Sequence, residues 1–386
     1  MKTLLKTLTL VIICFNMLSC NAKTDPKKND HKQLLAAKQQ DPKPSDKAIK
    51  VALLLDTSNS MDGLIDQAKA QLWDIVNELS YAKCDDAKPN LQIALYEYGN
   101  DRLNGDEGYI RQVLAFSDDL DDISKELFSL TTNGGNEYCG HVIQTSLNQL
   151  RWGNNPDDLK LIFIAGNEPF TQGQVSYKEA SKQAHKNDVS VNTIFCGDYR
   201  QGISSYWKEG ADLTHGDYMA INHNHATVHV PSPYDDELLH LNKKLNKTYV
   251  RYGSLGHSKM KMQSEQDSNA ERYSKATAVK RVESKSSHLY KNSKWDLVDA
   301  IEDEAIELEE IAEETLPEEL KGKSTQEKKN IIAAKSKERR DIQHQIQELS
   351  KKRKAFIAKE QPKNELERAM LNAIKKQAEK KDYKWE

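Results

Sequence analysis

Between residues 48 and 195, apolar patterns typical of strands alternate with apolar patterns typical of helices. Residues 49–55 read IKVALLL, a nearly continuous apolar run that is typical of a parallel strand buried on both faces. After a polar break, apolar residues recur every three or four positions from Leu64 to Leu79, which predicts an amphipathic helix. The same patterns predict strands at 91–98, 159–165 and 189–195 and helices at 142–152 and 177–186. This alternation indicates an α/β domain with a doubly wound, mostly parallel sheet, which we place at residues 48–232.

The polar break after the first strand is the first candidate for function. It reads Asp56-Thr57-Ser58-Asn59-Ser60, and open parallel sheets bind ligands beyond the carboxyl ends of their strands. A strand, then Asp-x-Ser-x-Ser, then an amphipathic helix resembles the von Willebrand factor type A domain, a Rossmann-like fold, and its metal-ion-dependent adhesion site. The resemblance implies that Ser58 and Ser60 bind a divalent cation directly and that Asp56 holds it through water. It also implies that a carboxylate of a protein partner completes the shell.

Two further loops depart from the family pattern. In the second loop, Asn136 stands where the family usually has a Thr after Gly-Gly, and Glu137 adds a carboxylate. In the third loop, Gly166 stands where the family usually has an Asp, and Asn167 and Glu168 follow it. We expect the two glutamates to compensate for the carboxylate that is lost.

Two interpretations of these loops remain open. In the first, a variant site holds Mg²⁺ or Mn²⁺, because both ions prefer octahedral shells of oxygen atoms. Its candidate ligands are Asp56, Ser58, Ser60, Glu137 and Glu168. In the second, no metal binds, and the Asp-x-Ser-x-Ser residues only brace the loop and cap the following helix.

The same loops carry candidate contacts for a partner and a candidate disulfide. Asn136, Asn167 and Phe170 lie in the second and third loops, and an exposed aromatic side chain at residue 170 would suit a partner contact. Cys139 lies on the second loop and Cys196 directly after a predicted strand. Outside the cytoplasm, the economical hypothesis is a disulfide between these two cysteines, which would clamp the second loop over the site.

The N-terminus resembles the signal of a bacterial lipoprotein. Residues 1–19 contain two early lysines and an apolar stretch, and Ser19 directly precedes Cys20. The resemblance implies cleavage before Cys20, acylation of its thiol and a membrane anchor; the alternative is an ordinary signal peptide. Residues 20–47, rich in Lys, Asp, Gln and Pro, predict a flexible tether. We therefore expect a location in the cell envelope, facing the periplasm or the exterior, and Asn21 favours the outer membrane.

Residues 233–386 predict a mainly helical region. A polar stretch at 254–287 offers few core residues, whereas 296–319 holds twelve acidic residues and no Lys or Arg. Residues 321–359 hold thirteen Lys and Arg against four acidic residues, and Ser324 and Glu327 form a capping box. We expect the acidic and basic segments to pair as an antiparallel helical hairpin, followed by one more helix at 366–378. The alternative is that the basic helix binds an acidic partner or anionic lipid.

The net charge and the lack of an evident catalytic triad reduce the number of function classes that fit this sequence. The chain has 56 basic and 59 acidic residues, a net charge of −3, which argues against nucleic acid as a partner. No third residue is evident that would orient Cys139 and His141 as a nucleophile and base. We predict a non-enzymatic protein-binding module for adhesion or assembly. The alternatives are a metal-dependent hydrolase built on Asp56, Glu137 and Glu168, and a scaffold that acts through its C-terminal helices.

Overall fold

The structure is a computed structural model and describes residues 47–84, 88–222, 230–360 and 365–385. The predicted signal, the tether and Cys20 lie outside these residues. Within the described residues, no helix combines the length and the apolar character needed to cross a membrane.

A six-stranded sheet forms the centre of the fold, in the order β4-β3-β1-β5-β6-β7. Every neighbouring pair is parallel except β3 and β4, so the predicted mostly parallel α/β sheet is confirmed. The antiparallel edge strand β4 was not predicted; its residues are mostly half-buried or exposed and its register to β3 is irregular, so it lacks a buried apolar run. The strands are β1 (Ala48–Asp56), β3 (Asn90–Tyr98), β4 (Ile110–Ser117), β5 (Leu159–Gly166), β6 (Ser190–Cys196) and β7 (Tyr218–Ile221).

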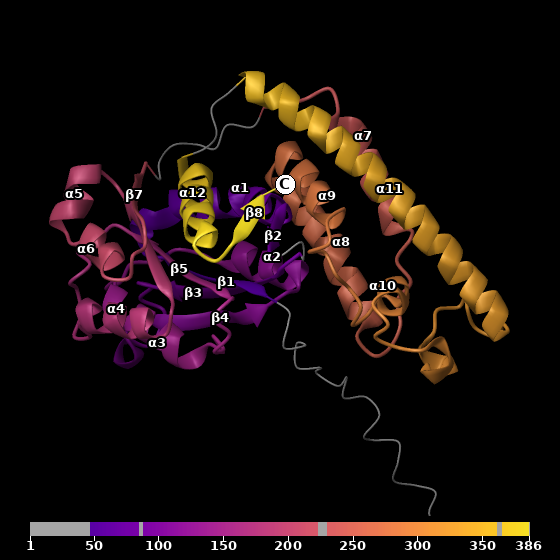
Figure 1. Cartoon of the computed structure of the whole chain (residues 1–386), viewed down its shortest axis with the longest axis horizontal. Helices are drawn as coiled ribbons and strands as arrows, with labels where there is room; N and C mark the ends of the chain where they lie inside the picture. Colours follow the sequence, from indigo (N-terminus) through magenta and orange to yellow (C-terminus); the bar gives the residue numbers. More distant parts are fainter. Residues whose placement is uncertain (1–46, 85–87, 223–229, 361–364, 386) are drawn as a thin grey trace, which may run out of the picture. The chain divides into compact units, whose positions relative to one another are not determined.

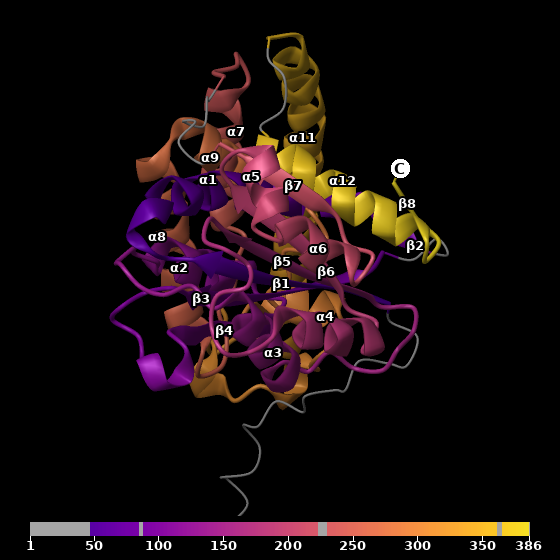
Figure 2. The ribbon, with the colours of Figure 1, turned by 90° about the vertical axis from the view of Figure 1, so that its left-hand side faces the viewer.

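Helices cover both faces of this sheet (Figures 1 and 2). Along β1, Val51 and Leu55 face one apolar cluster, and Ala52 and Leu54 face the other. The first cluster lies under α1 (Asp62–Leu79), α2 (Leu120–Ser129) and α12 (Glu365–Glu379). The second lies under α3 (Cys139–Gln149), α4 (Tyr177–Lys186) and α6 (Trp207–Asp212), and α5 (Tyr199–Ser204) precedes α6. A strand that is apolar on both faces therefore explains the sandwich of helix, sheet and helix.

The C-terminal half contributes to the same core. Its helices are α7 (Asp235–Asn246), α8 (Gly256–Tyr273), α9 (Lys275–Lys285), α10 (Leu297–Glu302) and α11 (Thr325–Glu360). After α12, the last strand β8 (Tyr383–Trp385) pairs with β2 (Ala82–Cys84), which follows α1. Ile374 of α12 and Val282 of α9 belong to the apolar cluster under α1. The change of composition near residue 232 therefore does not coincide with a division of the core.

The acidic and basic segments differ from the expected hairpin of two long helices. The acidic residues 296–319 form α10 and two short 3-10 helices, η4 (Leu308–Glu310) and η5 (Glu313–Thr315). Acidic residues four positions apart repel one another in a helix, which disfavours a continuous one. The charge pairing itself is present, because Arg339 of α11 lies 2.6 Å from Asp296 and Lys329 lies 2.9 Å from Glu309. The capping box is also confirmed, with the Ser324 amide 2.9 Å from the Glu327 carboxylate.

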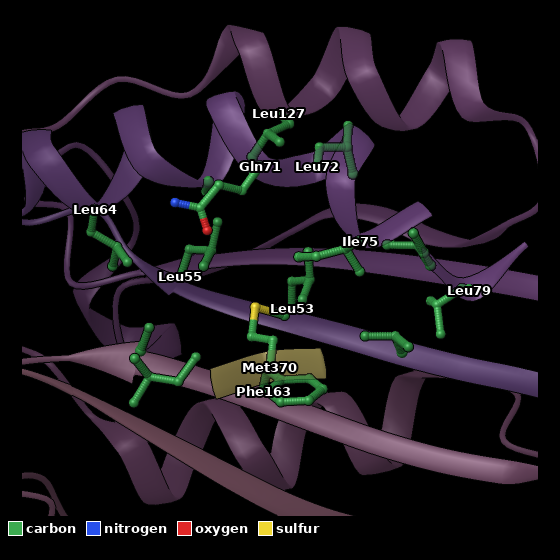
Figure 3. A pocket seen from close by; sticks show the side chains of 15 residues that line it. Leu53, Leu55, Leu64, Gln71, Leu72, Ile75, Leu79, Leu127, Phe163 and Met370 are labelled. Carbon is green, nitrogen blue, oxygen red and sulfur yellow. The ribbon is translucent and has the colours of Figure 1, made fainter. Parts of the chain in front are cut away.

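A small cavity lies between α1 and the sheet (Figure 3). Its volume is about 40 Å³, and its lining is apolar except for Gln71, whose amide points into it. Neither amide atom of Gln71 has a hydrogen-bond partner among the described residues. Met370 of α12 closes the cavity, so the C-terminal half completes the core beneath α1.

Candidate functional site

The three loops singled out in the sequence meet at the carboxyl ends of β1, β3 and β5. The amide of Thr57 donates to the carbonyl of Tyr98 over 2.9 Å, which joins the first loop to the end of β3. The amide of Asn133 donates to the carbonyl of Thr57, also over 2.9 Å, which joins the second loop to the first. Ser60 lies 3.2 Å from the side-chain amide of Asn167, which adds the third loop.

Asp56, the last residue of β1, lies buried at this edge of the sheet. It is fully buried, and its Oδ1 accepts a hydrogen bond from the amide of Ser58 at 2.7 Å. Its Oδ2 is also buried and has no hydrogen-bond partner among the described residues. Because an unpaired buried carboxylate oxygen is costly, this atom requires a proton or a cation.

Glu137 lies beside Asp56. It is 3% exposed, and its Oε2 accepts a hydrogen bond from the amide of Glu168 at 3.3 Å. A Cβ atom at Gly99 would lie 2.8 Å from both Asp56 Oδ1 and Glu137 Cγ, so a glycine with φ +79° lets the two carboxyl groups approach. Burial raises the pKa of Asp56 well above its ordinary value, and the neighbouring Glu137 raises it further. Burial likewise raises the pKa of Glu137.

The two serines of the motif point to the same edge. Ser58 Oγ and Ser60 Oγ lie 3.2 Å apart. Ser58 is the residue before the short 3-10 helix η2 (Asn59–Met61), yet its side chain makes no capping hydrogen bond, and Met61 before α1 makes none either. The hydroxyl groups therefore do not cap the helix, whereas Asp56 does brace the loop through the Ser58 amide.

The structure explains why the third loop has no carboxylate at residue 166. A Cβ atom there would lie 2.6 Å from the Tyr98 hydroxyl and 3.2 Å from Asp56 Oδ2. The Tyr98 hydroxyl is fixed in this place because it donates to the carbonyl of Ala165 at 3.0 Å. Any side chain at Gly166 would collide with it, so the second carboxyl group of the edge comes from Glu137.

Glu168 does not join the buried pair. Its side chain is exposed at the margin of the site, while its backbone amide contacts Glu137. Within the described ranges, no group of three or more His, Cys, Asp or Glu side chains is arranged to hold a metal ion. Of the five candidate ligands, Asp56, Ser58 and Glu137 are buried, whereas Ser60 and Glu168 are exposed.

One of the three predicted partner contacts is wrong. Asn136 is exposed and Asn167 is half-buried, but Phe170 is fully buried. The Phe170 ring packs against the rings of Tyr177 and Trp207, with centroid distances of 5.4 and 4.9 Å. Phe170 therefore supports the third loop from below and is not available to a partner.

The predicted disulfide is also wrong, because Cys139 and Cys196 are both free and buried. Cys139 belongs to the apolar cluster under α3, and Cys196 belongs to the cluster on the other face of the sheet. Both residues lie near the carboxyl edge, but the sheet separates their side chains. Burial raises the pKa of both thiols well above the ordinary value, which disfavours the reactive thiolate.

An exposed apolar patch near the third loop was missed. Tyr199, Ile203 and Tyr206 are 52%, 43% and 46% exposed. Tyr206 adopts a left-handed backbone conformation with φ 71°, which is rare for a bulky residue. The next residue, Trp207, donates from its ring to the carbonyl of Glu168 at 2.8 Å, which ties the patch to the third loop. Tyr199 and Ile203, four positions apart, share one face of α5, and this spacing was the available sequence signal, whereas Tyr206 lies beyond the end of the helix.

A comparison with family models identifies a known domain in the α/β part. Residues 50–204 match the family model of the von Willebrand factor type A domain. No curated protein matches the sequence.

Three solved structures to which this chain is similar each cover less than half of it. The conserved hypothetical protein BatB from Bacteroides thetaiotaomicron is 16% identical with a TM-score of 0.35, over 45% of this chain and 90% of that one. An aerotolerance-related membrane protein from Bacteroides fragilis NCTC 9343 is 15% identical with a TM-score of 0.32, over 46% and 94%. A von Willebrand factor type A protein from Catenulispora acidiphila is 15% identical with a TM-score of 0.33, over 46% and 39%.

Proposed function

We propose that this chain, whose residues 50–204 form a von Willebrand factor type A domain, binds a protein partner around a divalent cation at the carboxyl edge of its sheet. Domains of this family are generally interaction modules rather than enzymes. Asp56, Ser58, Ser60 and Glu137 would hold Mg²⁺ or Mn²⁺ here, with Glu168 at the exposed margin. The bound cation would supply an open coordination position for a carboxylate of the partner.

The observation that carries this proposal is the pair of buried carboxyl groups at the edge. Asp56 Oδ2 is buried without a partner among the described residues, and Glu137 lies beside it. No Lys or Arg of the described residues forms an ion pair with either group. The hydroxyl groups of Ser58 and Ser60 lie next to each other at the same edge, so the donor set consists of oxygen atoms, as hard cations require.

The exposed apolar patch supplies the second part of the binding face. Tyr199, Ile203 and Tyr206 are exposed on the segment that leads to Trp207, whose ring donates to the third loop, and tyrosine side chains are enriched in protein interfaces. The partner we propose therefore combines an acidic side chain for the cation with an apolar side chain for this patch.

The proposal is tested by thermal unfolding of the full chain with EDTA, Mg²⁺, Mn²⁺ or Ca²⁺. A ligand that binds only the native state raises the midpoint, and we expect a rise of roughly 3–6 °C at saturating Mg²⁺ or Mn²⁺. Asp56→Asn should abolish this rise. Asp101→Asn removes an exposed carboxylate at the same edge and should keep it. No rise with any ion, or equal loss in both variants, would contradict the cation site.

We also propose that a lipid on Cys20 holds this domain at a membrane of the cell envelope, with the outer membrane favoured. The support is the signal-like sequence before Cys20. Mass spectrometry of the N-terminal peptide of the mature protein tests it, since an unmodified Cys20 or an uncleaved leader would refute the anchor.

A further inference from the structure

A cleft of about 470 Å³ opens at the amino ends of β5 and β6, at the edge of the sheet opposite the carboxyl-edge site. Its walls come from parts of the chain that are far apart in sequence: residues 156–160 at the start of β5, residues 185–190 between α4 and β6, residues 214–215 before β7, and residues 377–382 at the end of α12 and after it. A volume of this size is typical of sites for small molecules. The C-terminal half therefore builds one wall of a cleft whose other walls belong to the α/β domain.

Lysine side chains outnumber acidic ones in this cleft. Four lysines line it, namely Lys47, Lys160, Lys380 and Lys381. Lys160 is 4% exposed, and its ammonium group donates to the carbonyl of Gly153 at 2.9 Å. Burial lowers the pKa of Lys160, and the nearby carboxylates of Asp188 and Asp158 offset this effect only in part. A buried ammonium group in the wall of an open cleft indicates a negatively charged ligand.

Two imidazole rings add hydrogen-bond donors. His185 and His215 line the cleft, and their rings meet edge to face with a centroid distance of 5.2 Å. Each neutral imidazole carries one N–H donor, and each protonated one carries two.

Three acidic side chains face the same cleft, and they do not neutralise it. Asp157 lies 3.7 Å from Lys47 and Asp188 lies 2.7 Å from Lys381, with the two carboxylates 57% and 59% exposed. Asp382 is the third. Ion pairs at such exposed positions contribute little free energy, so an incoming anion can replace them as a partner for the lysines.

The backbone around the cleft is unusual. Asp188, His215 and Asp382 have φ values of 56°, 57° and 61°. These are three of the six non-glycine residues with positive φ in the part of the chain that the structure describes, and all three line this cleft. Left-handed conformations of residues other than glycine cost free energy and cluster at binding sites.

We propose that this cleft binds a small multivalent oxyanion, one that carries two or more carboxylate or phosphate groups. Lys160 binds one anionic group in the wall, and Lys380 and Lys381 bind a second at the rim. The site is independent of the carboxyl-edge site, because it lies at the opposite ends of the strands.

The test is isothermal titration of the full chain in EDTA with pyrophosphate, citrate and, as a monovalent reference, acetate at matched ionic strength. We expect saturable binding of pyrophosphate or citrate, and which of the two binds identifies the oxyanion as a phosphate or a carboxylate. Lys380→Ala should weaken the binding about tenfold, because a charge-assisted hydrogen bond is lost. Lys160→Met should weaken it at least as much.

The matched control is Lys337→Ala, which removes an exposed lysine of α11 that pairs with Asp341 away from the cleft. This variant should bind as tightly as the parent chain. Lys380 is exposed at the end of α12, so its loss should leave folding intact even where Lys160→Met does not. Absence of saturable binding, or equal weakening by Lys337→Ala and Lys380→Ala, would overturn the proposal.

Discussion

Two groups of buried acidic residues in this molecule have opposite surroundings. In the C-terminal half, Asp296 and Asp235 each face a buried cation: Arg339 lies 2.6 Å from Asp296, and Arg353 lies 2.8 Å from Asp235. At the carboxyl edge of the sheet, Asp56 and Glu137 face each other, and no ion pair of the described residues involves them.

The difference separates a structural role from a binding role. Although burial alone would raise it, Lys285 and Arg281 lower the pKa of Asp267 far below its ordinary value, so this carboxylate is charged and satisfied within the fold. Burial and Glu137 instead raise the pKa of Asp56. Basic side chains pair with buried carboxylates in the C-terminal helices, whereas no basic side chain of the described residues pairs with Asp56 at the Asp-x-Ser-x-Ser loop. A proton or a cation is therefore needed at that edge, and the cation is the ligand that we propose.

The largest expected effect comes from breaking a pair in the C-terminal half. Arg339→Met leaves Asp296 buried without its cation, and it also removes a hydrogen bond of 2.8 Å to the carbonyl of Thr248. Removing one partner of a buried ion pair typically costs about 3–5 kcal/mol of unfolding free energy. Urea unfolding measures this loss.

Arg340→Met is the control for this variant. Arg340 pairs with Glu302 at 2.6 Å, but its side chain is 61% exposed. An exposed pair is worth about 0–1 kcal/mol. Similar losses in both variants would contradict a structural role for the buried network.

A second prediction concerns a buried polar group that has neither a partner nor a proposed ligand. Gln71 lies in the apolar cavity under α1, and neither of its amide atoms has a partner among the described residues. Gln71→Leu should therefore raise the unfolding free energy by about 1–2 kcal/mol, because the cost of burying an unpaired amide disappears.

Gln67→Leu is the matched control, one turn earlier on α1. The Gln67 amide donates to the carbonyl of Asn222 at 3.1 Å, so this variant should lose stability. A loss in Gln71→Leu as well would mean that the cavity holds partners for the amide, such as water.

Much of the fold follows from the sequence because the central strands are buried on both faces. The predicted strand at 49–55 is β1, and the predicted helix at 177–186 is α4. The stretch at 254–287 was expected to offer few core residues, yet it forms α8 and α9, and Arg281 and Lys285 of α9 are buried. Paired charges fill core positions there, and hydrophobic periodicity cannot detect a core of that kind.

The candidate site was predictable only in part, because some of its contacts join residues that are far apart in the sequence. The first loop was found because its residues are adjacent in sequence. The role of Gly166 depends on the Tyr98 hydroxyl, which comes from a different strand. Phe170 was expected to be exposed because its position in a loop does not reveal that its ring packs into the core. The Cys139–Cys196 disulfide was predicted because the sequence does not reveal that the two side chains lie on opposite faces of the sheet.

The smallest expected effect belongs to the carboxyl edge itself, in the absence of divalent cations. The pKa of Asp56 is raised above its unfolded value, so the stability that its proton provides is present at low pH and is lost as pH rises through the folded-state pKa.

Glu137→Gln removes the neighbouring negative charge, so in EDTA it should stabilise the chain at pH 8 by about 1 kcal/mol, equivalent to less than one pKa unit. The gain should shrink as the pH falls, because the pKa values of both carboxyl groups are raised and the repulsion disappears as they take up protons. Urea unfolding in EDTA at both pH values measures it, with Asp101→Asn as an exposed carboxylate control. If Glu137→Gln instead destabilises the chain equally at both pH values, Glu137 acts only through its packing, and the contrast between the two regions does not hold.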